Sequence, residues 1–299
     1  AGTAIGVDTM TTVANNFGGL PPQYSELANS KVVLVPVPYD GTSTWIKGAD
    51  KGPEAIIRAS ANMEVYDIET DSQVYQQGIF TDAPVAGGAS SPEQMVEAVR
   101  GKVQGHLANG KFVVVVGGEH SVSIGAIQAH VHQFPGVSVL QLDAHSDLRQ
   151  EYEGSKNNHA CVMARAREMC PIVQVGIRSM DISETKGLQR DRIFFAEHIH
   201  DSAAWIDLVV GKLSEQVYIT IDLDVFDPSI MPSTGTPEPG GLRWYDVLAL
   251  MRAVCSRKKV VGLDVVEMCP VANQWAPDFL AAKLIYKILS YKFLAGGGK

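Results

Sequence analysis

The stretch VSVLQLDAHSDLRQEYEGS, from Val137 to Ser155, runs from an apolar segment directly into a group of ionisable side chains. Asp143, His145 and Asp147 follow the apolar segment at two-residue spacing. Side chains two residues apart on an extended backbone point to the same face, so these three are expected to converge on one small volume. A positively charged partner, such as a metal ion, is therefore expected at this end of the strand.

Similar apolar segments recur along the chain and alternate with helix-like segments. The helix-like segments include residues 91–110, with Ser91 as the N-cap and Gly110 past the end, and residues 243–254. Strands are expected at residues 31–39, 111–118, 137–143, 172–178, 192–197, 217–224 and 260–267. This alternation predicts an α/β fold with a mostly parallel sheet flanked by helices. Periodicity alone allows either a closed eight-stranded barrel or an open sheet.

The chain reads as one large domain preceded by an extension. No linker or internal repeat divides its 299 residues. Residues 1–30 are expected to form an N-terminal arm, and residues 31–299 a single catalytic domain.

Composition restricts the partners and the compartment. The net charge of −8 and the absence of a basic run argue against nucleic acid and acidic membranes, and favour small cationic ligands. The four cysteines show no C-x-x-C pattern, which indicates reduced thiols. Residues 1–19 lack the pattern of a signal peptide, and no apolar run has the ~20 residues that a membrane span needs. A cytoplasmic location is expected.

Three predicted strands end in residues that can bind metals. In parallel sheets the carboxyl ends of the strands meet at one edge, so two imidazoles and four carboxylates are expected to lie together there. They are His120, Asp143, His145, Asp147, Asp222 and Asp224. Four clustered carboxylates require cations, and an oxygen-rich set without thiolates suits two Mn²⁺ ions better than one tetrahedral Zn²⁺. The D-x-H-x-D run by itself could also be a solvated loop, and Asp227 is interpreted as a turn residue.

The motifs GGEHSVS, DAHSD, DLDVFDPS and TGTPEPGGL, in this order, resemble those of the ureohydrolase family of arginases and agmatinases. The resemblance extends from Val32 to Leu289. It implies a three-layer α/β/α sandwich around a parallel eight-stranded sheet, and hence the open sheet rather than the barrel. It also implies a homo-oligomer, either a trimer or a hexamer.

The same resemblance implies roles for individual residues. One Mn²⁺ would be held by His120, Asp143, Asp147 and Asp222, and the other by Asp143, His145, Asp222 and Asp224, with Asp143 and Asp222 bridging. A metal-bridging hydroxide would then attack the guanidinium carbon. His159 would carry protons to the leaving amine, Glu267 would bind the guanidinium group, and Asp147 would join them in the catalytic set.

The substrate is expected to be agmatine, hydrolysed to putrescine and urea for polyamine synthesis. The loop after Asp147 resembles the agmatinase pattern, and Glu151 could attract a terminal ammonium group. Asp181 aligns with a position that contacts the amino group of arginine in arginases, so it does not separate the two substrates. Arg149 and Lys156 keep guanidinobutyrate and arginine open as alternatives. The remaining alternatives for the function are a non-catalytic metal-binding homologue and a deacetylase with one zinc ion.

Overall fold

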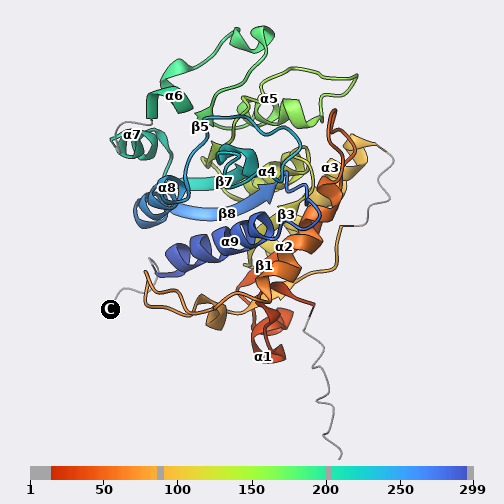
Figure 1. Ribbon diagram of the computed structural model, residues 1–299, viewed down its shortest axis with the longest axis vertical. Helices are drawn as coiled ribbons and strands as arrows, with labels where there is room; N and C mark the ends of the chain where they lie inside the picture. The colour runs from red at the N-terminus through yellow and green to blue at the C-terminus, as the bar shows by residue number, and fades with distance from the viewer. Residues whose placement is uncertain (1–14, 86–90, 200–203, 295–299) are drawn as a thin grey trace, which may run out of the picture.

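A single parallel sheet forms the centre of the molecule (Figure 1). The computed structural model describes residues 15–85, 91–199 and 204–294. The strands are β1 (Val32–Val37), β2 (Ile79–Thr81), β3 (Phe112–Gly117), β4 (Ser138–Leu142), β5 (Ile172–Ile177), β6 (Ile193–Phe195), β7 (Gln216–Asp222) and β8 (Lys259–Val266). Their order is β2-β1-β3-β8-β7-β4-β5-β6, and every neighbouring pair is parallel. The sheet ends at β2 and β6, so it is open, as the family resemblance implied, and not a barrel.

Helices cover both faces of this sheet. They are α1 (Pro22–Ser25), α2 (Gly52–Ser60), α3 (Pro92–Ala108), α4 (Val122–Gln133), α5 (Val162–Arg167), α6 (Ala196–Ile199), α7 (Trp205–Lys212), α8 (Trp244–Arg257) and α9 (Ala276–Leu294). Residues of α2, α7, α8 and α9 belong to one buried apolar cluster, and residues of α3, α4 and α5 to another. In Figure 1, α2 and α9 lie in front of the strands and α4 lies behind them. The predicted three-layer sandwich is confirmed.

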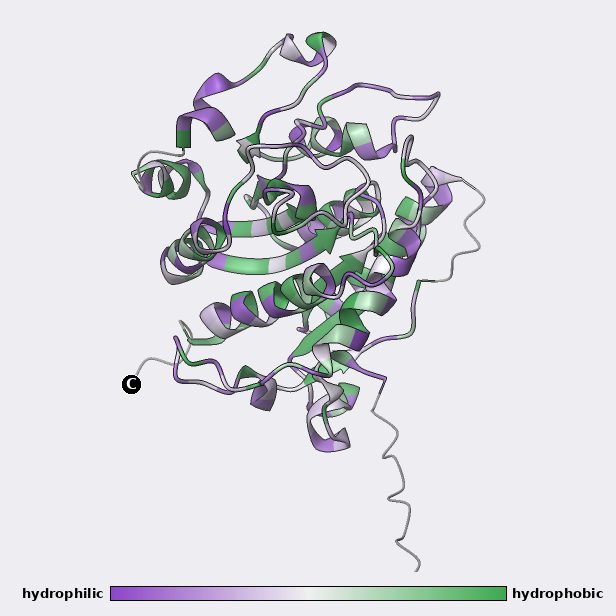
Figure 2. Ribbon diagram, in the orientation of Figure 1, coloured by the Kyte–Doolittle hydropathy of each residue, from purple (hydrophilic) through white to green (hydrophobic). Residues whose placement is uncertain are grey.

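The sequence of each strand explains why both faces are covered. Along β1, Val32 and Leu34 join the cluster under α2 and α9, whereas Val33 and Val35 join the cluster under α3 and α4. Alternate side chains of a strand point to opposite faces, so a continuous run of valine and leucine must be buried on both sides. Figure 2 shows these strands in green, the colour of hydrophobic residues.

The two edge strands depart most from the predictions, whereas the ends of the other strands differ by one or two residues. The edge strand β2 was not predicted, because three residues before a polar turn carry too little periodicity to be recognised. At the other edge, the strand predicted at 192–197 ends at Phe195, and helix α6 begins at Ala196. The helix predicted from Ser91 is confirmed as α3, and the hydroxyl of Ser91 accepts a hydrogen bond from the amide of Gln94.

The segment before β1 packs against the sheet. Phe17 is fully buried, its amide donates to the Thr81 hydroxyl over 2.9 Å, and Leu20 is 3% exposed. Residues 17–20 therefore contribute to the main core, although they lie in the predicted arm. Residues 1–14 of that arm lie outside the described residues. The division into an arm and a catalytic domain stays a prediction.

Two further features agree with the composition. All four cysteines are free thiols. Within residues 15–85, 91–199 and 204–294, no helix is both long enough and apolar enough to cross a bilayer.

Candidate metal centre and active site

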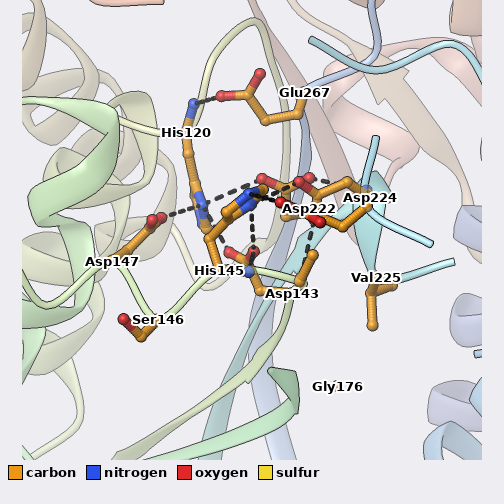
Figure 3. A network of polar contacts seen from close by, with 12 residues as sticks. His120, Asp143, His145, Ser146, Asp147, Gly176, Asp222, Asp224, Val225 and Glu267 are labelled. Atoms are coloured by element: carbon orange, nitrogen blue, oxygen red, sulfur yellow. Dashed lines mark hydrogen bonds and ion pairs between the residues drawn. The ribbon is translucent and has the colours of Figure 1, made fainter. Parts of the chain in front are cut away.

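The four central strands bring the candidate ligands together at their carboxyl ends. Strands β3, β8, β7 and β4 are neighbours in the sheet. His120 follows β3, Glu267 follows β8, Asp222 ends β7, and Asp143 begins the loop after β4. Figure 3 shows these side chains converging from their separate strands. The predicted convergence is confirmed, and it results from the strand order, which periodicity could not give.

The ligand atoms form two groups that share one residue. The Nδ1 atom of His120 lies 3.0 Å from Asp147 Oδ2 and 3.2 Å from Asp143 Oδ2. The Nδ1 atom of His145 lies 2.8 Å from Asp224 Oδ2 and 3.6 Å from Asp143 Oδ1. In each group the ligand atoms lie within 4.8 Å of one another. Asp143 belongs to both groups, as expected for a bridging carboxylate.

Asp222, the second predicted bridging ligand, lies next to both ligand groups but is a member of neither. Its Oδ2 atom lies 3.5 Å from His120 Nδ1, and its Oδ1 atom accepts a hydrogen bond of 2.9 Å from the Asp224 amide. It is 4% exposed and lines the same cavity as His120. This places Asp222 within reach of the candidate metals, and its bridging role stays a prediction.

The residues present fit a pair of metal ions. Nδ1 of His120 is fully buried, has no hydrogen-bond partner and faces three carboxylates. The opposite ring nitrogen, Nε2, lies 2.9 Å from the Thr220 hydroxyl, which donates to Asp264 over 2.7 Å. A metal ligand of this kind needs one free nitrogen directed at the metal and the other held by a polar neighbour. Asp264 is fully buried and also accepts a hydrogen bond of 2.6 Å from the Tyr218 hydroxyl, so it anchors this polar neighbour.

The electrostatics of the cluster also indicate that cations bind there. Burial, followed by the nearby charge of Asp143, raises the pKa of Asp147 to about 7. Burial and the charge of Asp224 raise the pKa of Asp222 well above its usual range. Burial disfavours the imidazolium form of His145, yet Asp224 and Asp143 outweigh it and raise its pKa to about 12. Protons thus compensate the carboxylates when cations are absent, and divalent metals would replace them.

Two of the site residues have left-handed backbone conformations. Asp147 has φ of 51° and Glu267 has φ of 66°, in a region that residues other than glycine rarely adopt. Such conformations cost on the order of 1–3 kcal/mol each and persist where the surrounding structure enforces them. Asp147 lies in the loop after β4 and Glu267 directly after β8, and both line the same cavity.

Glycine permits the close packing behind the cluster. A Cβ atom at Gly118 would lie 1.9 Å from the carbonyl oxygen of Tyr39. The lack of a Cβ atom at Gly118 therefore allows two backbone segments to approach closely beside His120.

A cavity of about 320 Å³ opens above the metal ligands. Glu267 and His159 line it close to the ligands, and Asp181 and Arg149 line it as well. Glu267 is half-buried, and one of its carboxylate oxygens accepts a hydrogen bond of 2.7 Å from the His120 amide. Burial and the charge of Glu119 raise the pKa of Glu267 well above its usual range.

His159 is oriented by a neighbour that was not predicted. Both its backbone amide, at 3.0 Å, and its ring Nδ1, at 3.2 Å, contact the hydroxyl of Thr42. Burial, followed by the nearby positive charge of His120, lowers the pKa of His159 to about 4. The ring also meets the edge of Tyr152, with a centroid distance of 6.0 Å.

The two predicted contacts for the far end of the substrate differ in position. Asp181 lines the cavity, caps a short helical turn and lies 3.7 Å from the Arg149 guanidinium. Glu151 is exposed and is not among the residues that line the cavity. The structure therefore brings Asp181, but not Glu151, together with the other predicted site residues, and the roles of both stay predictions.

Several residues that build the site were not predicted from the sequence. Glu184, at the cavity wall, accepts hydrogen bonds of 2.7 Å from both the Ser146 hydroxyl and the Leu148 amide. It forms a capping box with Asp181, and the pattern Asp-x-x-Glu is a recognisable signal for one. Thr42 and Thr220 carry no such signal, because their partners are distant in the chain. The turn predicted at Asp227 is confirmed by its carboxylate, which accepts from the amides of Ser229, Gly240 and Gly241.

An α/β sandwich with a carboxylate and imidazole cluster of this kind, beneath a polar cavity, defines a metal-dependent hydrolase. The model of the arginase family matches residues 30–290, and the chain belongs to this family. It is a ureohydrolase of the agmatinase-like branch, and the residues of the family's binuclear metal site are present.

The similar proteins agree in sequence and in structure. The chain is 38% identical to the N(1)-aminopropylagmatine ureohydrolase of Synechocystis sp. over 294 residues, which cover 93% of this chain and 96% of that protein. It is 39% identical to the protein of the same name from Thermus thermophilus, with 94% and 96% covered. The crystal structure of the agmatine ureohydrolase of Thermoplasma volcanium superposes with a TM-score of 0.84 at 30% identity, covering 94% of each chain.

Proposed function

We propose that this protein is a manganese-dependent ureohydrolase that removes urea from a linear guanidine compound with an amine at its far end. The observation that carries the proposal is the pair of ligand groups that share Asp143, placed beside Glu267 in one cavity. Carboxylates and imidazoles without thiolates suit Mn²⁺, and the shared carboxylate suits two adjacent ions.

The residues of the chain divide the work of the reaction. His120, Asp143 and Asp147 would hold one ion, and Asp143, His145 and Asp224 the other, with Asp222 alongside. When bound, manganese supplies Lewis-acid activation of the attacking water. Glu267 would accept two parallel hydrogen bonds from the planar guanidinium group and so orient its carbon. His159 would deliver a proton to the amine nitrogen as its bond to that carbon breaks.

Two amine-terminated substrates are candidates. Agmatine would give putrescine and urea. N(1)-aminopropylagmatine would give spermidine and urea, and it is favoured by the names of the relatives that are 38% and 39% identical to this chain. Both carry the same guanidinium group, so Glu267 and the metal ligands cannot distinguish them.

Among the described residues that line the cavity, Arg149 is the one arginine or lysine, so it is the residue that could bind a substrate carboxylate. Arg149 could meet guanidinobutyrate or arginine, but its guanidinium lies 3.7 Å from Asp181 and 4.3 Å above the ring of Tyr152. Because Asp181 offsets much of its charge, Arg149 is a weak attraction for an anion. The wall of the cavity therefore favours a cationic tail.

A substrate panel tests the proposal. The manganese-loaded protein is assayed for urea release from agmatine, N(1)-aminopropylagmatine, guanidinobutyrate and arginine at equal concentrations. The two amine-terminated compounds should be hydrolysed far faster than the two acids. A reversed preference would reject the substrate class, and no urea from any of them would favour a non-catalytic homologue. The matched control is Asp143→Ala, which removes the shared ligand and should abolish urea release.

A further inference from the structure

A buried chain of hydrogen bonds connects His159 to a carboxylate that has no place in the mechanism above. Thr42 lies in the loop after β1, is 6% exposed, and contacts both the amide and the ring of His159 through its hydroxyl. On its other side lies Glu119, whose side chain is fully buried. Glu119 and His159, which lie 77 and 117 positions away in the chain, thus both contact Thr42, the first through its amide and the second through its hydroxyl.

The partners of Glu119 show in which direction the hydrogen atoms point. Its carboxylate accepts from the Ser121 hydroxyl at 2.6 Å, from the Ser121 amide at 2.9 Å and from the Thr42 amide at 3.4 Å. The Thr42 hydroxyl is a further donor to it. With four donors around it, the carboxylate acts as the acceptor at the end of the chain.

This direction decides the role of each ring nitrogen of His159. The Thr42 hydroxyl oxygen accepts the His159 amide with one lone pair, and its hydrogen is available to the Glu119 carboxylate. With the hydroxyl hydrogen donated to Glu119, the second lone pair is available to Nδ1 at 3.2 Å, and this arrangement favours the neutral ring that carries its hydrogen on Nδ1. Nε2 is then left with a lone pair, on a side chain that lines the cavity.

We propose that Thr42 is a positioning residue, which together with Glu119 keeps the hydrogen on Nδ1 of His159 and so leaves Nε2 to exchange protons with the substrate. This inference rests on the proposed function. During turnover, Nε2 takes a proton from the attacking water and gives it to the leaving amine nitrogen as the bond between carbon and nitrogen breaks. The hydrogen on Nδ1 stays in place throughout, and neither Thr42 nor Glu119 gains or loses a proton.

Packing on the other side of the ring supports the same orientation. The edge of Tyr152 meets His159 at a centroid distance of 6.0 Å, and Arg149 stacks 4.3 Å above Tyr152. The imidazole is therefore held by a hydrogen bond along one edge and by an aromatic contact as well. A side chain fixed in this way loses little entropy when it acts on the substrate.

The test compares Thr42→Val, which removes the hydroxyl at nearly constant shape, with Thr42→Ser, which keeps it. General acid and base groups contribute about 10²- to 10⁴-fold to rates, so losing the orientation should lower kcat by at least about tenfold. KM and the manganese content per chain should stay as in the wild type, because Thr42 is neither a proposed metal ligand nor a proposed substrate contact. Thr42→Ser should keep kcat within about threefold.

A double-mutant cycle separates positioning from a general structural effect. In the His159→Ala background, Thr42→Val should change kcat by less than about twofold, because the group it positions is absent. The inference is overturned if Thr42→Val has the wild-type kcat, if it is as harmful in the His159→Ala background, or if Thr42→Ser is as slow as Thr42→Val. If Thr42→Val does not fold, Thr42→Ala is judged by the same criteria.

The proposed function can fail independently of this inference. A wild-type protein that releases no urea from any guanidine compound refutes the function. An active wild-type protein with an unaffected Thr42→Val variant refutes only the role of Thr42.

Discussion

Replacing Glu267 by glutamine should keep its hydrogen bond with the His120 amide but remove its proposed contact with the substrate. One carboxylate oxygen, Oε1, accepts the hydrogen bond of 2.7 Å from the His120 amide. The other, Oε2, lies 3.8 Å from the position that a Cβ atom at Gly235 would take, and Gly235 lines the cavity. Glutamine keeps the size of the side chain and one acceptor oxygen. It can therefore hold the His120 amide, but it presents an NH₂ group where the substrate needs an acceptor.

The expected loss follows from the hydrogen bonds to the guanidinium group. Hydrogen bonds to a charged group contribute about 1.5–3 kcal/mol, compared with about 0.5–1.5 kcal/mol for neutral ones. Of the two hydrogen bonds proposed between Glu267 and the guanidinium group, glutamine weakens one by removing the negative charge and loses the other because its NH₂ group cannot accept. The stabilisation of the transition state should therefore fall by about 3 kcal/mol. At about 1.4 kcal/mol per factor of ten, kcat/KM should fall on the order of 100-fold.

The assay measures urea release together with the manganese content of the purified variant. Glu267→Gln should retain the metals, because the bond that fixes the backbone of His120 is preserved. Glu267→Ala is the matched comparison: it also removes that bond, worth about 1 kcal/mol, beside a proposed metal ligand. A Glu267→Gln variant with normal manganese content and a kcat/KM within about threefold of the wild type would refute the assignment.

Other residues allow separate tests. Asp143→Ala should lose both manganese ions and Asp147→Ala about one, because Asp143 belongs to both ligand groups and Asp147 to one; elemental analysis that finds two ions in Asp143→Ala would contradict this. His159→Ala should lower kcat about 100-fold with little change in KM, and an unchanged kcat in steady-state assays would exclude a proton-carrying role. Gly262→Ala would place a Cβ atom 2.1 Å from Nε2 of the buried His130 and should cost about 2–3 kcal/mol of folding free energy, seen as a lower Tm in calorimetry; an equal Tm would mean that His130 moves without cost.

The metal ligands could be predicted because the relevant signal is local. Asp143, His145 and Asp147 follow an apolar strand at a spacing of two, and this spacing places side chains on one face wherever the strand lies. Asp222 and Asp224 repeat the same pattern after a second strand. Parallel strands point their carboxyl ends to one edge, so the predicted convergence rested on the assumption that these strands lie close together in one sheet.

The residues that orient the active site could not be predicted in this way. Thr42 contacts His159 across 117 positions of sequence, and Thr220 contacts His120 across 100. Each is a threonine in a segment that gives no sign of its partner. The exposed position of Glu151, in contrast to that of Asp181, likewise depends on how the loop after β4 folds back on the cavity.

By itself, the sequence determined the class of fold, the six candidate ligands and the negative charge that calls for cations, because hydrophobic period and residue type are local properties. The tertiary structure alone decided the strand order, the open edges at β2 and β6, and the sharing of Asp143 by two ligand groups. It also decided that Nδ1 of His159 contacts the Thr42 hydroxyl. These features depend on distances between atoms that are far apart in the chain, and only the packed sheet brings such atoms together.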